Sequence, residues 1–158
     1  MSRRPVVALA ILASTFPVVA LADLSGTVTL QASTALNLDT GATSASGGDL
    51  LWNGTILTPQ GSAGIFNFLI SGDLGPNLYA NITQQSLSVI AVGNYSKTGG
   101  LGGSSLAVGA VIGVHTNGGN YAKVLVTSSS GGSVGLQYTT FGASGTGGGP
   151  QAPTSNLG

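Results

Sequence analysis

The segment from Leu106 to Phe141 constrains the fold more than any other part of this 158-residue chain. Apolar residues recur there at every second position along three stretches, which is the period of a β-strand with one buried face. The recurring residues are Leu106, Val108, Ala110, Ile112 and Val114, then Ala122, Val124 and Val126, then Val134, Leu136 and Tyr138. Two turn sequences, NGGN at 117–120 and SSSGG at 128–132, separate the stretches and accept the backbone angles of tight hairpins. We therefore predict an antiparallel meander of three strands.

The rest of the chain also favours strands over helices. Glutamate is absent, and Thr, Ser, Val and Gly dominate the composition, as is typical of short strands joined by tight turns. Strands are predicted in TVTLQ (27–31) and GIFNFLISG (64–72), whereas SLSVIAV (86–92) fits either a central strand or a short helix. The predicted fold is all-β: an antiparallel sandwich or small barrel of roughly seven to nine strands that ends in the meander.

Both termini differ in composition from this β region. Residues 1–22 are predicted to be an export signal, because Arg3 and Arg4 precede an apolar run that ends in the cleavage pattern Ala20-Leu21-Ala22. We expect residues 23–141 to form the β domain, and residues 142–158, rich in Gly, Pro and Ser, to form a flexible tail or linker. The protein is thus expected to be a secreted bacterial protein, extracellular, at the cell surface or periplasmic, without a membrane span after signal cleavage.

The scarcity of charge excludes one class of partner. Beyond the predicted signal, the charged residues are Asp23, Asp39, Asp49, Asp73, Lys97 and Lys123. They cannot form the basic surface that nucleic-acid binding requires. The chain also has no cysteine, so neither a disulfide framework nor a cysteine zinc site can hold the domain together, and we expect no cofactor.

The sharpest chemical motif is Asp39-Thr40-Gly41, which follows an apolar residue and precedes Ala42-Thr43. It resembles the active-site loop of the pepsin and retropepsin families of aspartic peptidases. That resemblance implies a dimer in which each chain contributes Asp39, and in which two carboxylates share one proton. Val111-Ile112-Gly113 would then be the family's second motif, which braces the active-site loop.

Three features favour a turn over a catalytic loop. The sequence after Gly41 stays small and polar as far as Asp49, the 111–113 segment is already explained by strand alternation, and only Gly-rich turns lie between the two motifs. We therefore predict an Asx-type turn, in which the Asp39 carboxylate accepts backbone N–H groups and Gly41 adopts a positive φ angle.

A second resemblance covers most of residues 36–144. LNLDTGATSASGGDLLWNGTILTPQGSA (36–63) and VGAVIGVHTNGGNYAKVLVTSSSGGSVGLQYTTFGAS (108–144) resemble a small uncharacterised β domain of exported proteins from soil bacteria, acidobacteria especially. The resemblance implies an exported β domain and recurrence of the LDTG turn outside peptidases. It implies no activity.

Few other side chains are candidates for chemistry or binding. Trp52, Tyr121 and Lys123 are the binding candidates: Trp52 as a core residue or a platform for a sugar ring, and the other two as a contact patch if their face of the strand is exposed. His115, the single histidine, is expected at the surface beside the NGGN turn. Asp39 and Asp49 could share a calcium ion, although no D-x-D-x-D spacing supports a metal site.

We therefore expect a non-catalytic exported module for binding or assembly. Its expected partners are further copies of itself or another surface protein, because a β protein with few charged side chains has little electrostatic protection against pairing of strand edges. Two alternatives remain open at this point. One is a carbohydrate-binding module that holds a polysaccharide with Trp52 and exposed tyrosines, and the other is the dimeric aspartic peptidase.

Overall fold

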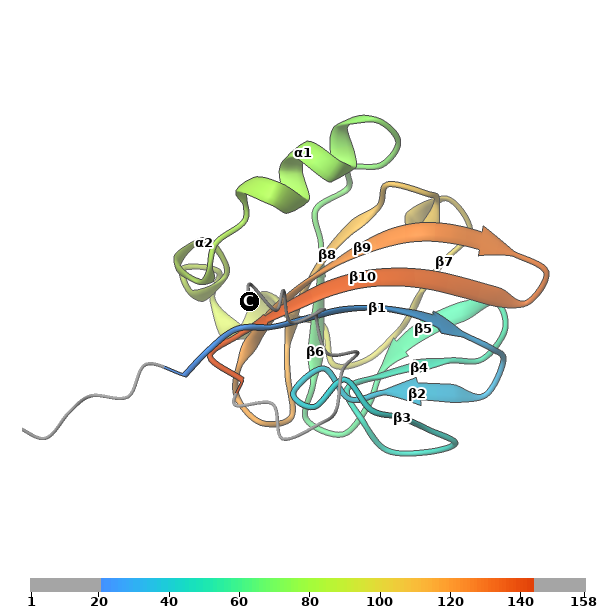
Figure 1. The fold of residues 1–158 in the computed structure, drawn as a ribbon, viewed down its shortest axis with the longest axis horizontal. Helices are drawn as coiled ribbons and strands as arrows, with labels where there is room; N and C mark the ends of the chain where they lie inside the picture. Colours follow the sequence, from blue (N-terminus) through green and yellow to red (C-terminus); the bar gives the residue numbers. More distant parts are fainter. Residues whose placement is uncertain (1–20, 144–158) are drawn as a thin grey trace, which may run out of the picture.

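The chain folds into two five-stranded antiparallel sheets that face each other (Figure 1), as seen in a computed structural model that describes residues 21–143. The first sheet has the order β1-β10-β9-β8-β6 and the second the order β3-β2-β4-β5-β7. The strands of the first sheet are β1 (Leu24–Leu30), β6 (Gly64–Asn67), β8 (Val111–His115), β9 (Tyr121–Ser130) and β10 (Ser133–Phe141). Those of the second are β2 (Thr34–Leu36), β3 (Thr43–Ser44), β4 (Leu50–Trp52), β5 (Ile56–Pro59) and β7 (Leu101–Gly102). The predicted all-β sandwich is confirmed and is not a closed barrel, but its described residues form ten strands where roughly seven to nine were predicted.

The main core lies between the two sheets, where inward side chains of both form one apolar cluster. Its fully buried members include Leu36, Leu50 and Leu57 from the second sheet, and Val124 and Leu136 from the first. Tight packing of such aliphatic side chains stabilises a domain that has no disulfide.

The predicted meander is confirmed as β8, β9 and β10. The NGGN turn lies where it was predicted, whereas the second turn is formed by Gly131 and Gly132 alone, because residues 128–130 belong to β9. The first strand begins later than its alternation indicated. Leu106 belongs to a 3₁₀ turn, η2 (Gly103–Leu106), and Val108 is 54% exposed outside the core. The reason is that the turn around Gly109, with a φ of +82°, separates Val108 from β8.

A helical layer covers the outer face of the first sheet, and of its elements only a short helix within 86–92 was among the predicted alternatives. It contains α1 (Leu74–Asn81), α2 (Gln84–Ser88) and the 3₁₀ turn η1 (Val92–Asn94), and Figure 1 shows α1 and α2 on the side of β8 and β9 away from the second sheet. A second apolar cluster fills the interface and joins Tyr79, Ile82 and Leu87 to residues of β8–β10. The strand predicted as one alternative for 86–92 is therefore wrong. The alternative of a short helix is correct for residues 86–88, where α2 ends.

The two predicted strands outside the meander are shifted or shorter. TVTLQ lies in β1, which begins three residues earlier, at Leu24, and ends at Leu30. GIFNFLISG forms strand only over β6, because Leu69 adopts a φ of +56° and ends the extended chain. Most of the predicted signal and tail lies outside the described residues. Neither α-helix within residues 21–143 has the length and apolar character needed to cross a bilayer.

The four outer strands of the sandwich differ in how much pairing surface they leave open. In the second sheet, β3 and β7 are two residues long. In the first sheet, β6 is bridged by Ser96, which exchanges two backbone hydrogen bonds with Ile65. Among the strands of residues 21–143, only β1 presents a long edge, seven residues in an unbroken register with β10.

Candidate functional site

Two aspartates from the second-sheet loops converge on the turn between β8 and β9. Asp39 lies in the loop from β2 to β3, and Asp49 immediately precedes β4. The NGGN sequence of the turn lies 68 or more residues away along the chain from both. These three loops form the most polar cluster of the described domain, and they join one sheet to the other.

The local turn around Asp39 is built by a different residue from the one predicted. Asn37 supplies the Asx oxygen, because its Oδ1 accepts hydrogen bonds from the N–H groups of Asp39 (2.9 Å) and Thr40 (3.1 Å). Gly41 has a φ of +73°, as expected, and donates its N–H to the carbonyl of Asn37 at 2.8 Å. The turn prediction is thus correct for Gly41 and misplaced for the side chain that stabilises it.

The carboxylate of Asp39 instead binds the distant hairpin turn. Its Oδ1 accepts from the hydroxyl of Thr116 and the amide of Asn120, each at 2.9 Å, and its Oδ2 accepts from the N–H of Gly118 at 3.1 Å. A Cβ atom at Gly118 would lie 2.6 Å from Oδ2, so this close approach requires glycine.

Asp49 also binds this turn, and its side chain is fully buried. Its Oδ1 accepts from the N–H of Asn117 at 2.6 Å, and its Oδ2 accepts from the N–H of Leu38 at 2.7 Å. Burial raises the pKa of the Asp49 carboxyl above its ordinary value of 3.8, and the charge of Asp39 contributes in the same direction. The two N–H donors lower that pKa and so oppose part of the increase.

The side chains of Asn117 and Asn37 hold this cluster together, and the sequence did not indicate these contacts. The Asn117 Oδ1 accepts from the N–H groups of Ser62 and Ala63, and its Nδ2 donates to the carbonyl of Gly48 at 2.6 Å. The turn signal of Asn117-Gly118 was recognised, but the contacts of its side chain reach two other loops that no local pattern indicates.

The chemistry of this cluster is that of a structural brace. Each of the four carboxylate oxygens already accepts a hydrogen bond from a neutral donor. Within residues 21–143, no group of three His, Cys, Asp or Glu side chains is placed to hold a metal ion. The Asp39 carboxylate therefore connects two loops of one chain, whereas the hydrogen bonds of Thr40 and Gly41 stay within their own turn.

Trp52, predicted to be either a core residue or a platform for a sugar ring, is a core residue. Its side chain is 4% exposed, and its indole N–H donates to the carbonyl of Gly132 in the β9–β10 turn at 2.7 Å. Because the side chain belongs to the main cluster and is almost fully buried, it offers little surface on which a sugar ring could stack.

The predicted contact patch of Tyr121 and Lys123 depended on exposure of their face, and the helical layer covers that face. Lys123 is 9% exposed, and its Nζ donates to the carbonyls of Tyr79 (2.8 Å) and Ile82 (2.9 Å) at the end of α1. The ammonium also lies 4.7 Å from the ring centroid of Tyr79, at the range of a cation–π contact. Burial lowers the pKa of Lys123, and Asp23 opposes part of that change.

Tyr121 is partly buried and belongs to an aromatic group that includes the histidine. Its ring centroid lies 5.1 Å from that of His115 and 6.0 Å from that of Tyr95. His115 is half-buried in this contact, so it is less exposed than predicted.

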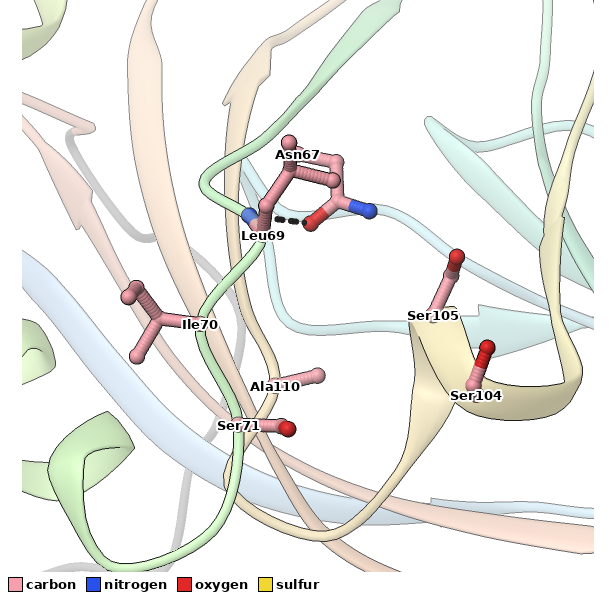
Figure 2. Close-up of a pocket in the computed structure, with 7 residues that line it drawn as sticks. All are labelled: Asn67, Leu69, Ile70, Ser71, Ser104, Ser105 and Ala110. Atoms are coloured by element: carbon pink, nitrogen blue, oxygen red, sulfur yellow. Dashed lines mark hydrogen bonds between the residues drawn. The ribbon is translucent and has the colours of Figure 1, made fainter.

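A shallow cavity of about 190 Å³ lies between the chain that follows β6 and the 3₁₀ turn η2 (Figure 2). Its polar lining consists of Asn67, Ser71, Ser104 and Ser105, and the Asn67 Oδ1 accepts from the N–H of Leu69 at 2.9 Å. The cavity offers hydrogen bonds to a ligand, but none of its lining residues is a charged group or a general base.

Comparison with known proteins gives little further information. No protein-family model matches the chain, and no curated protein matches it. Among solved structures, a match is the apo HmuY analog of Tannerella forsythia, with 12% sequence identity and a TM-score of 0.45. The match covers 75% of this chain and 96% of that chain.

Proposed function

We propose that this chain is a non-catalytic, exported β module whose role is assembly, and that it associates through the open edge of β1. The observation that carries the proposal is the contrast among the sheet edges: three are very short or bridged, and the fourth is long and regular. Natural β proteins block their edges unless pairing is used.

The composition of β1 supports this role. Its sequence, LSGTVTL, contains no charged residue and no proline, and its register with β10 has no bulge. Charges, prolines and bulges are the features that prevent pairing between edges. An unprotected seven-residue edge is long enough to receive a further strand.

The polar side chains support a non-catalytic role. Asp39, Asp49 and Lys123 are all engaged in hydrogen bonds that hold loops or helix ends in place. A hydrolytic site needs a group that is free to exchange protons with a substrate or with water. The contacts of these three side chains are internal to the domain.

Sedimentation of the chain from Asp23 to Gly158 over a range of concentrations tests the proposal. We expect reversible association, and we expect Thr27→Lys to weaken it at least about tenfold, because a charge in the middle of an edge opposes pairing. A wild-type chain that stays monomeric at the highest concentration would refute the assembly function.

Gln137→Lys is the matched control. Gln137 lies on the adjacent strand β10, where it pairs with Thr27 of β1. Its substitution therefore adds the same charge to the same face of the sheet, one strand away from the edge. Association that survives Gln137→Lys and not Thr27→Lys identifies the edge as the contact. Loss with both variants would indicate that the face of the sheet is the contact instead, and would count against edge pairing.

A further inference from the structure

We infer that the partner of β1 is the β1 strand of a second copy, paired antiparallel about a twofold axis at Thr27, so that assembly stops at a dimer. This inference rests on the proposed assembly function and adds the partner, the register and the stoichiometry. It follows from the direction of main-chain groups along the edge, from half-covered apolar side chains, and from the pattern of the strand itself.

The main-chain groups that β1 directs away from the sheet can be identified from the hydrogen bonds of the neighbouring strands. Val126 of β9 exchanges backbone hydrogen bonds with Gly109 and Ala110, on the β8 side. Successive residues of a strand direct their main-chain groups to opposite sides, so Leu125 directs its groups to its β10 partner, Gln137.

The same alternation carries across β10 to the edge. Because Gln137 is directed towards β9, its neighbour Tyr138 is directed towards β1 and its partner there, Gly26. The intervening residues Ser25, Thr27 and Thr29 therefore direct their N–H and C=O groups outward. Within residues 21–143, β10 is the one strand that pairs with β1.

These three residues complement a second copy of themselves. With Thr27 opposite the partner copy's Thr27, Ser25 lies opposite Thr29, and all three pairs are of the hydrogen-bonded type that exchanges two N–H···O bonds. Their side chains are exposed on one face, where hydroxyl pairs across strands add modest stabilisation. The register uses every outward main-chain group of the three residues.

The opposite face of β1 supplies the apolar part of the contact. Leu24 and Val28 are partly buried and pack against the main cluster at its open end. In the twofold register, Leu24 lies opposite Leu30 and Val28 opposite Gly26 of the second copy. Pairing would therefore cover the exposed parts of Leu24 and Val28 and continue the core from one copy to the other.

Cysteine cross-linking tests the register directly, because the chain has no native cysteine. At a hydrogen-bonded antiparallel pair the Cα atoms are about 5.5 Å apart, within the span of a disulfide. We expect Thr27→Cys to form a covalent dimer on mild oxidation. Ser25→Cys alone should not do so, because its two copies would be about 13 Å apart along the strands, whereas a mixture of Ser25→Cys and Thr29→Cys should cross-link.

Charge complementation tests the same axis without a disulfide. Thr27→Lys and Thr27→Glu should each dissociate at least about tenfold more readily than wild type, because like charges would oppose each other across the axis. A one-to-one mixture should recover association as a heterodimer. Far-ultraviolet circular dichroism and Trp52 fluorescence verify that each variant is folded.

The outcomes separate this inference from the function on which it rests. A monomeric wild-type chain refutes both. Association that Thr27→Lys weakens, with Ser25→Cys cross-linking to itself, would show either a parallel pair or a twofold axis at Ser25, and would overturn the axis at Thr27 alone. Wild-type species larger than a dimer, or mixed charge variants that fail to recover, would also overturn the twofold inference while leaving edge assembly in place.

Discussion

Asp49 couples the stability of the domain to pH through its burial. Its folded-state pKa is raised above the ordinary 3.8, so the folded protein holds this proton more tightly than the unfolded chain. The stabilising contribution is fully present below pH 3.8 and is lost as the pH rises through the folded-state pKa.

We therefore predict that the stability deficit of Asp49→Asn is larger at pH 3 than at pH 7. The variant removes the titration, and its amide nitrogen would face one of the two N–H donors, a mismatch that costs about 1–3 kcal/mol. Chemical denaturation of wild type and variant at both pH values measures the difference. A deficit that is constant, or that shrinks at pH 3, would show that Asp49 is not the titrating group.

Lys123 is predicted to be a structural residue that holds the end of α1. Lys123→Met keeps an unbranched apolar stem but leaves the carbonyls of Tyr79 and Ile82 without their donor. We expect a loss of about 2–4 kcal/mol in the free energy of unfolding, measured by urea denaturation. Lys97→Met, which removes a charge from an exposed residue, serves as the control and should change stability little.

For single residues, the sequence predicted backbone conformation better than it predicted the hydrogen-bond partners of side chains. The positive φ of Gly41 followed from the turn pattern, because glycine adopts it without steric cost. The contacts of Asp39 with Gly118 and of Asn117 with Ser62 did not, since they connect loops far apart in the chain. Lys123 was taken as a candidate for the surface because alternation shows which face a residue occupies and not what covers that face.

Among the elements, α2 depends on its cap because it is only five residues long. The Thr83 hydroxyl accepts from the N–H of Ser86, and the Ser86 hydroxyl accepts from the N–H of Thr83, which is the reciprocal arrangement of a capping box. We predict that Thr83→Ala lowers stability by about 1 kcal/mol, measured from the denaturation midpoint. Thr83→Ser should retain most of the stability, and an equal loss in both variants would argue against the cap.

The meander was predictable because its signal is local. Alternation and two turn sequences within residues 106–141 determine both the strands and their order. The helices were not predictable in this way: α1 and α2 are short, and short helices owe most of their stability to tertiary packing. A partial signal was present, because Val111 and Leu125 make the second face of β8 and β9 apolar, which indicates a covering layer without identifying it.

At the scale of the whole molecule, the two apolar clusters share the same strands. Val124 belongs to the main cluster and its neighbour Leu125 to the helix-covered one, so we expect one cooperative unfolding transition. We predict that Leu87→Ala, in α2, costs about 2–5 kcal/mol and shifts the Trp52 fluorescence transition together with the circular dichroism. Transitions that separate in the variant would show that the helical layer unfolds independently.

The sequence left the choice between a sandwich and a barrel open. Alternation identifies the buried face of each strand, but closure depends on which edges pair, and those pairings join distant segments. β1, for example, lies beside β10 at the far end of the domain sequence. Among the described strands, none pairs with the other side of β1.

The helical layer lies on one side of the first sheet only, as Figure 1 shows, and this one-sidedness has a consequence for a twofold pair. An antiparallel axis at Thr27 runs perpendicular to the joined sheet, so it keeps outer face with outer face. Both copies of α1 and α2 would then point in the same direction. Such a pair would be bivalent. A surface that binds one helical layer weakly could bind both layers at once, and the overall binding would be stronger than that of either layer alone.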